Sequence, residues 1–158
     1  MNIKQRPGTP FAGTLTYIDH EYSIDFIHSE PDQYLDRTPD GVACVAINTL
    51  QIEVGLPRYE ALHVWGYFPK ISWTTAALPI PRSTPGVVQF VGSTFQRSIA
   101  YGVSDEDSWR REFDPRSGWI RVAPEGASAE HLTEIADGVL IGAADGQLSS
   151  IWMRPLFA

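Results

Sequence analysis

The sequence has few of the residues that build disulfides and metal centres. It contains one cysteine, Cys44, among 158 residues. A single thiol cannot form an internal disulfide or a cysteine-based zinc site. The run Val42 to Ile47 around it is apolar, so we expect a small buried hydrophobe. A nucleophilic cysteine would need a neighbouring base, and none is close in the sequence.

Motifs for catalysis and for metal binding are also missing. The four histidines show no pair at i,i+4 spacing and no H-E-x-x-H motif; they are His20, His28, His63 and His131. Asp19, Glu21 and Asp25 lie near two of them, but a hairpin there would separate the carboxylates, so we expect no metal and no cofactor. There is no G-x-S-x-G elbow, Walker loop or G-x-G-x-x-G motif. These absences favour a protein that is not an enzyme without deciding the point.

Long apolar runs and positive charge are both scarce. No apolar run approaches the roughly 20 residues of a membrane helix, and the polar segment Met1 to Pro10 has no signal-peptide core. We therefore expect a cytoplasmic protein with no membrane contact. With 12 Lys and Arg against 19 Asp and Glu, the net charge is −7. This charge repels nucleic acids and favours a basic partner, although solubility alone is the simpler explanation, since a net charge of this size is ordinary for small domains.

Glycine and proline are frequent and interrupt short apolar runs. The 13 glycines and 12 prolines leave little room for long helices. The pattern predicts a single domain, residues 1–158, that is mainly β or a β-dominated α+β fold. We expect about eight mostly antiparallel strands forming a barrel or a strongly bent sheet, because closure hides strand edges. The clearest predicted strands are Thr14–Asp19, Tyr22–His28, Val42–Ile47, Leu50–Val54, Ala61–Phe68, Val87–Val91, Ser98–Val103, Trp119–Val122, Val139–Ile141 and Leu148–Met153.

Segments between these strands have their own signals. Ser104–Arg111 and Ser128–Ile135 begin with a capping serine, so each is expected to be a short helix. Ser29–Asp40 is expected to be a polar loop, and Leu78–Pro85 an extended surface segment. Asp145-Gly146 is a strong signal for a tight hairpin turn.

A weak internal repeat relates residues 14–55 to residues 110–155. Tyr22 precedes Asp40-Gly41-Val42 by the same spacing with which Trp119 precedes Asp137-Gly138-Val139. The repeat is explained either by a duplicated hairpin unit or by chance in a chain rich in turn dipeptides.

One turn in the C-terminal third carries a resemblance. The run Phe113-Asp114-Pro115-Arg116-Ser117-Gly118-Trp119 is followed by Asp137-Gly138 and by Asp145-Gly146. It resembles small uncharacterised bacterial proteins and domains with an aromatic-D-P-x-[ST]-G-W turn and a D-G hairpin near the C-terminus. The resemblance implies a β-rich bacterial fold of unknown function. It carries over no catalytic residue.

Aromatic residues of the middle segment are the candidates for ligand binding. His63, Trp65 and Tyr67 alternate onto one face of a strand, which would place an imidazole, an indole and a phenol in a row. His63 is the candidate general base, and Trp65, Tyr67 and Trp73 are the candidate ligand-binding residues. The simpler explanations are a core stripe, a structural histidine and a tryptophan that plugs a barrel end.

Two functions remain. The first is a small acidic, non-enzymatic binding protein, such as an immunity or antitoxin-type inhibitor, whose acidic run Asp105, Glu106 and Asp107 meets a basic partner protein. The second is a small barrel that binds a hydrophobic ligand or acts as a cyclase or isomerase through its shape. Exposed strand edges would also allow a homodimer. We expect no nucleic-acid partner.

Overall fold

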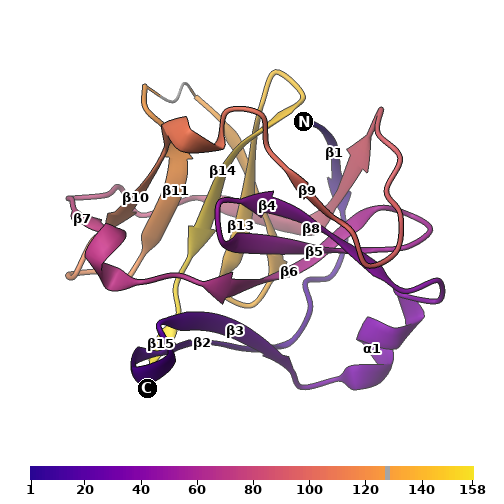
Figure 1. The fold of residues 1–158 in the computed structure, drawn as a ribbon, viewed down its shortest axis with the longest axis horizontal. Coiled ribbons are helices and arrows are strands. Elements are labelled where there is room, and N and C mark those ends of the chain that lie inside the picture. Colours follow the sequence, from indigo (N-terminus) through magenta and orange to yellow (C-terminus); the bar gives the residue numbers. More distant parts are fainter. Residues whose placement is uncertain (127–128) are drawn as a thin grey trace.

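The computed structural model describes residues 1–126 and 129–158, and Figure 1 shows its fold. The mainly β prediction is confirmed, but these residues form fifteen strands rather than about eight. The strands that were not predicted are those over residues 2–7, 74–75, 109–113, 131–136 and 156–157. The elements are β1 (Asn2–Pro7), β2 (Gly13–Ile18), η1 (Asp19–Glu21), β3 (Ser23–His28), α1 (Pro31–Asp36), β4 (Val42–Ile47), β5 (Leu50–Gly55), β6 (Glu60–Tyr67), η2 (Lys70–Ser72), β7 (Thr74–Thr75), β8 (Ser83–Val91), β9 (Ala100–Gly102), η3 (Glu106–Ser108), β10 (Trp109–Phe113), β11 (Ile120–Pro124), β12 (His131–Ala136), β13 (Val139–Ala144), β14 (Gln147–Met153) and β15 (Leu156–Phe157).

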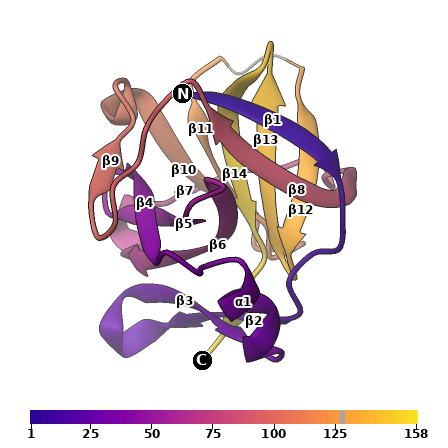
Figure 2. The same ribbon diagram turned by 90° about the vertical axis from the view of Figure 1, so that its right-hand side faces the viewer.

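All strands belong to one mixed sheet whose main path runs β15-β2-β3-β6-β8-β12-β13-β14-β11-β10-β7. Most pairings are antiparallel, whereas β4–β9, β8–β12, β10–β7 and β15–β2 are parallel. The join between β6 and β8 is a single residue pair, Glu60 with Gln89. At this narrow point the sheet changes from a group of strands around β4, β5 and β6 to a group around β8 and β12 to β14. Figure 2 shows the two groups from the side.

One hydrophobic core is shared by both groups of strands. Ile52 and Val64 from the first group belong to the same buried cluster as Ile141 and Ile151 from the second. Successive side chains of a strand point to opposite faces. Each group of strands therefore has one apolar face, and these faces form the shared core. In β5, for example, Leu50, Ile52 and Val54 are fully buried. The two groups therefore pack against each other as one unit.

The two ends of the strand path lie close together without strand pairing between them. In the described part of the chain, β15 pairs only with β2, and β7 only with β10. Their side chains nevertheless meet, because the rings of Trp73 and Phe157 are 6.3 Å apart and those of Phe113 and Phe157 are 5.7 Å apart. The sheet is thus strongly bent, and its two ends are in contact through aromatic side chains. Backbone hydrogen bonds between these ends, which would close a barrel, are not found among the described residues.

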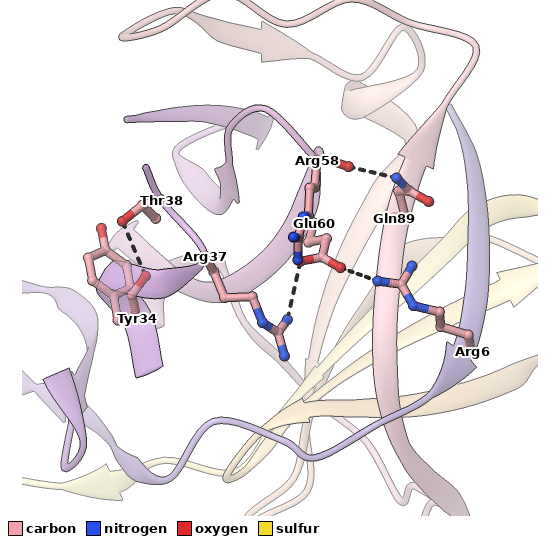
Figure 3. A network of polar contacts seen from close by, with 7 residues as sticks. All are labelled: Arg6, Tyr34, Arg37, Thr38, Arg58, Glu60 and Gln89. Atoms are coloured by element: carbon pink, nitrogen blue, oxygen red, sulfur yellow. Dashed lines mark hydrogen bonds and ion pairs between the residues drawn. The ribbon is translucent and has the colours of Figure 1, made fainter. Parts of the chain in front are cut away.

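A buried carboxylate reinforces the narrow join between β6 and β8 (Figure 3). Glu60 is 1% exposed and pairs with Arg6 of β1 and, at 3.4 Å, with Arg37 after α1. Next to it, Gln89 Nε2 donates a hydrogen bond of 2.8 Å to the Arg58 carbonyl. Because a buried charge needs partners, this network links four segments at one point.

Three predicted segments differ from the structure. The predicted loop Ser29–Asp40 contains α1, which begins at Pro31, a residue that is compatible with the first turn of a helix. The predicted helix Ser104–Arg111 is only the short η3, after which β10 begins. The predicted helix Ser128–Ile135 is replaced by β12, because β13 and β8 supply backbone partners there; its predicted cap, Ser128, lies outside the described residues.

Turn chemistry was the most reliable local signal. Asp145 and Gly146 have positive φ values of 53° and 72° and join β13 to β14, as the dipeptide predicts. The Asp114 turn is also formed: its carboxylate accepts hydrogen bonds from the backbone N–H groups of Leu78 and Arg116, each 2.9 Å long. These bonds hold the pKa of Asp114 below its usual value. Among the described residues, no helix is long and apolar enough to cross a membrane.

Candidate functional site

Trp65 and Tyr67, two of the predicted ligand-binding residues, line a surface cleft of about 370 Å³. Their exposed fractions are 38% and 53%. Tyr22 stands beside them, with its ring 6.4 Å from that of Tyr67. We call this the Trp65 cleft; it is lined by Ile18, Glu21, Ser23, Ile24, Asp25, Trp65, Gly66 and Tyr67.

The cleft exists because β3 and β6 pair over only two residues. Ser23 pairs with Tyr67 and Ile24 with Gly66, after which the pairing stops. The same register would place Asp25 opposite Trp65. Gly66 has φ of +133°, and a Cβ atom at this position would lie 2.3 Å from the Thr49 carbonyl oxygen, so only glycine fits. The pairing ends at this irregular backbone, and Asp25 and Trp65 both line the cleft.

The charge of the cleft is negative. Glu21 and Asp25 are exposed, and its lining contains no Lys or Arg. Asp25 Oδ1 accepts a hydrogen bond from the Phe26 amide at 2.9 Å. Glu21 Oε2 lies 3.4 Å from the Ser23 hydroxyl. Two carboxylates beside two aromatic rings form a surface suited to a cation, since a cation is attracted both by carboxylates and by ring faces.

His63, the candidate general base, lies in a buried hydrogen-bonded chain instead of an open site. Cross-strand pairing aligns it with Glu53 and Cys44 across β6, β5 and β4. His63 Nε2 is 3.4 Å from Glu53 Oε2, which accepts a 2.6 Å hydrogen bond from the Tyr34 hydroxyl. On its other side, His63 Nδ1 is 2.9 Å from His28 Nε2. This Tyr34–Glu53–His63–His28 chain is called the histidine chain below.

Burial sets the charge state of the histidine chain. It lowers the pKa of His63 to about 3, with a further contribution from neighbouring His28, and it also lowers the pKa of His28. Burial raises the pKa of Glu53, with Asp25 adding in the same direction and the Tyr34 hydrogen bond opposing it. If Glu53 accepts the His63 Nε2 proton, His28 must donate to His63 Nδ1. His28 Nδ1 is then a lone pair, and it is buried without a partner among the described residues.

Access to His63 is blocked by its neighbours. The residue is 7% exposed. The ring of Phe26 stacks on it at 5.6 Å, and the rings of His28 and Tyr34 lie within 5.9 Å. A substrate would have to displace one of these side chains to reach the imidazole. The arrangement is therefore that of a structural histidine, and its role as a base stays a prediction.

Cys44 lies on the outer face of β4, half-buried, and not in the core as the apolar run implied. The core positions on either side are Ala43 and Val45. Burial, together with the charge of Glu53, raises the pKa of the Cys44 thiol to about 11, so it stays protonated near neutral pH. This is the opposite of what a nucleophilic cysteine requires.

Trp73, the third predicted ligand-binding residue, lies in a different place from Trp65 and Tyr67. It is half-buried and lines a second cavity, of about 340 Å³, with Lys70, Thr75, Phe113 and Phe157. The structure thus separates Trp73 from the pair formed by Trp65 and Tyr67.

The predicted partner-binding run is partly occupied by contacts within the protein. Asp105 Oδ1 accepts a 3.2 Å hydrogen bond from Trp109 Nε1, and Glu106 Oε2 accepts a 2.8 Å bond from the Asn48 amide. These bonds stabilise the chain around η3. Of these three described residues, Asp107 alone is exposed and has no side-chain hydrogen bond. The run remains a prediction as a docking surface, with fewer free carboxylates than expected.

Sequence reasoning missed the residues that complete these sites. The sequence suggested Glu21 and Asp25 only as part of a cation-binding cluster with His20 and His28, and it did not connect His28 with His63. Their proximity depends on how β3 lies against β6, which no local pattern encodes. Within the part of the chain that the structure describes, no three His, Cys, Asp or Glu side chains gather so as to hold a metal ion.

The sequence matches no known protein family, and no curated protein is detectably similar to it.

Proposed function

We propose that this protein is a non-enzymatic binding protein for a basic partner protein, and that the Trp65 cleft receives an arginine or lysine side chain of that partner. The observation that carries this proposal is the pairing of two exposed carboxylates with two exposed aromatic rings in one cleft. An inhibitor of the immunity or antitoxin type is the biological role that we propose for it.

The chemistry of the cleft favours a guanidinium or ammonium group over other ligands. Glu21 and Asp25 attract positive charge, and the faces of Trp65 and Tyr67 add cation–π attraction of about 0.5–2 kcal/mol. A phosphate or carboxylate would be repelled by the same carboxylates and by the net charge of −7. Ile18, a partly exposed apolar residue of the lining, suits the methylene stem of such a side chain.

The test uses peptides of six arginines and of six citrullines, which differ in charge but hardly in shape. We expect the arginine peptide to bind at physiological salt and the citrulline peptide to bind at least tenfold more weakly. The double variant Glu21→Gln/Asp25→Asn should weaken the arginine peptide about tenfold, and Trp65→Ala about three- to tenfold, because each removes one class of contact. Isothermal titration calorimetry measures the affinity of each peptide for the unmodified protein and for both variants.

The matched control is Glu30→Gln/Asp40→Asn, which removes the same formal charge from two exposed carboxylates elsewhere on the surface. It should change the arginine-peptide affinity less than twofold. Equal losses in both double variants would mean that only bulk charge acts, and would overturn the assignment to the Trp65 cleft. Absence of arginine-peptide binding to the unmodified protein would overturn the proposed function itself.

A further inference from the structure

Arg111 is a charged residue on the core-facing side of a strand. Because side chains alternate along β10, Trp109, Arg111 and Phe113 share one side of it. Trp109 is buried, and Phe113 packs against the main core. The Arg111 guanidinium carbon lies 4.4 Å from the centre of the fully buried Phe68 ring. A cation thus occupies a position that two aromatic neighbours mark as apolar.

This cation has no carboxylate partner among the described residues. Half-buried arginines in that part of the chain are Arg37, Arg111 and Arg121. Arg37 forms an ion pair with Glu60 at 3.4 Å. Arg121 forms one with Glu112, also at 3.4 Å. Arg111 alone of the three is left without one, and burial lowers its pKa below the usual value. A half-buried charge without a counter-ion is unfavourable unless something else supplies the opposite charge.

Arg111 lines a surface cleft of about 390 Å³ beside β7 and β10, two strands that pair in parallel (Figure 1). We call it the Arg111 cleft; its other lining residues are Asn48, Ser72, Thr74, Trp109 and Arg110. Arg111 Nη1 donates a hydrogen bond of 3.1 Å to Ser72 Oγ, and this contact is exposed. The charged end of the side chain is therefore accessible from solution at the wall of the cleft.

Most of the hydrogen-bonding capacity of this guanidinium is unused. A guanidinium has five N–H groups. One donates to Ser72 Oγ and one, at 3.4 Å, to Thr49 Oγ1. Both hydroxyls donate their own protons to backbone carbonyls, Ser72 to Pro69 and Thr49 to Tyr67. The two hydroxyls therefore hold the guanidinium in place as acceptors, and three of its N–H groups have no protein acceptor within the described residues.

The charge around the cleft matches one negative charge better than two. The lining contains no Asp or Glu. Its second cation, Arg110, is already paired with Glu125 at 2.9 Å. Next to the lining, Glu106 Oε2 accepts a 2.8 Å hydrogen bond from the Asn48 amide and places one carboxylate beside the cleft. Arg111 is thus the one cation of the lining that lacks an ion pair in the described structure.

We propose that the Arg111 cleft binds the carboxylate of a small polar organic acid, which accepts hydrogen bonds from two of the remaining N–H groups of Arg111. A carboxylate matches the planar fork of a guanidinium and brings a single negative charge. A doubly charged phosphate is repelled more strongly by Glu106 and by the net charge of −7. The Thr74 hydroxyl and the Asn48 side-chain amide suit polar substituents of the acid, and the volume lies at the lower end of the range for ligand sites.

The experiment compares lactate with lactamide, which has nearly the same shape but no charge, and with inorganic phosphate, all at constant ionic strength. The ¹⁵N–¹H spectrum follows the arginine Nε–H signals, and Arg111→Lys assigns that of Arg111. We expect lactate to bind about tenfold more tightly than lactamide and also more tightly than phosphate. Lactate should move the Arg111 Nε–H signal.

Three variants separate the contributions of the fork, its charge and the bulk charge. Arg111→Gln should weaken lactate about tenfold, and Arg111→Lys about threefold, because lysine keeps the charge but loses the fork. The control is Arg82→Gln, which removes an exposed arginine outside the cleft. It should change the lactate affinity less than about twofold, since long-range charge is screened by salt.

Urea unfolding without lactate tests whether Arg111 is only a packing residue. Arg111→Gln removes a half-buried charge that lacks a counter-ion, so its unfolding midpoint should be unchanged or higher. A clearly lower midpoint would assign Arg111 a packing role and count against the proposal.

The proposal is overturned if lactate leaves the Arg111 signal in place, if lactamide binds as tightly as lactate, or if Arg82→Gln and Arg111→Gln weaken lactate equally. The Arg111 cleft shares no residue with the Trp65 cleft. Glu21→Gln/Asp25→Asn should therefore retain lactate binding, and the two proposals can fail separately.

Discussion

At the scale of single residues, the histidine chain shows how packing removes a charge that the residue would carry in water. His63 is held neutral because burial penalises its protonated form and because His28 lies next to it, with His28 Nε2 2.9 Å from His63 Nδ1. Protonation would place a cation beside His28 with no water to solvate it. Acid should therefore favour the unfolded chain, in which this histidine can take up a proton freely.

The first prediction concerns the pH dependence of stability. The pKa of His63 is about 3 in the folded protein and about 6.5 when unfolded, so the unfolded chain takes up more protons between these values. Stability should fall as pH drops through this window, by about 2 kcal/mol between pH 6.5 and pH 5. His28 acts in the same direction, whereas the raised pKa of Glu53 opposes it. Urea unfolding at pH 7 and pH 5 measures the change.

His63→Gln provides the comparison, since glutamine keeps hydrogen-bonding groups but does not titrate. The variant should lose less stability than the unmodified protein over the same pH interval. Parallel stability–pH curves for the two proteins would show that His63 does not carry the effect.

Residue patterns predicted the two aromatic residues of the Trp65 cleft but not its two carboxylates. Trp65 and Tyr67 stood out because large aromatic side chains share one face of a predicted strand. Glu21 and Asp25 looked like ordinary hairpin carboxylates, because their partner strand is about 40 residues further along the chain. Similarly, Asp105 and Glu106 looked free in the sequence, whereas Trp109 and Asn48 engage them in the fold.

At the scale of elements, the network around Glu60 connects β1, the end of α1, β6 and β8 where the sheet is narrowest (Figure 3). Glu60→Gln keeps the shape of the side chain but removes its charge. Its two arginine partners are partly exposed and can turn to water, so we expect a loss of only about 1–2 kcal/mol in the free energy of unfolding.

Removing both cations should cost more. Arg6→Gln/Arg37→Gln leaves the Glu60 carboxylate buried without a charged partner, and we expect about 3–5 kcal/mol. Arg110→Gln is the control, because its pair with Glu125 is largely exposed and should contribute less than about 0.5 kcal/mol. Denaturant unfolding measures all three; a larger loss for Glu60→Gln than for the double variant would contradict this account.

Element prediction succeeded where local chemistry decides and failed where distant partners do. The Asp145-Gly146 turn and the alternating strand β5 follow from backbone conformation and periodicity. The strand β1 was missed because only Ile3 of its six residues is buried, which leaves hardly any pattern to detect. The segment His131–Ala136 could have been helical by composition, but pairing with β13 and β8 makes it a strand.

At the scale of the whole molecule, one core shared by two groups of strands predicts a single cooperative transition. Ile52→Ala in β5 and Ile141→Ala in β13 each create a cavity at a fully buried position. Each should lower the free energy of unfolding by about 2–5 kcal/mol. Because the core is continuous, each variant should shift the transition seen by circular dichroism and that seen by tryptophan fluorescence equally. Transitions that separate in either variant would indicate two independent units.

The pairing of β1 has a consequence for the order in which the chain is made. This strand is synthesised before both of its partners, because it pairs along its full length with β8 and at one residue with the start of β14. Its pairing with β8 can therefore be completed only after residue 91 has been synthesised. Lys4, Gln5 and Arg6 keep this segment hydrophilic while it is unpaired, so we expect it to stay in solvent until β8 is available.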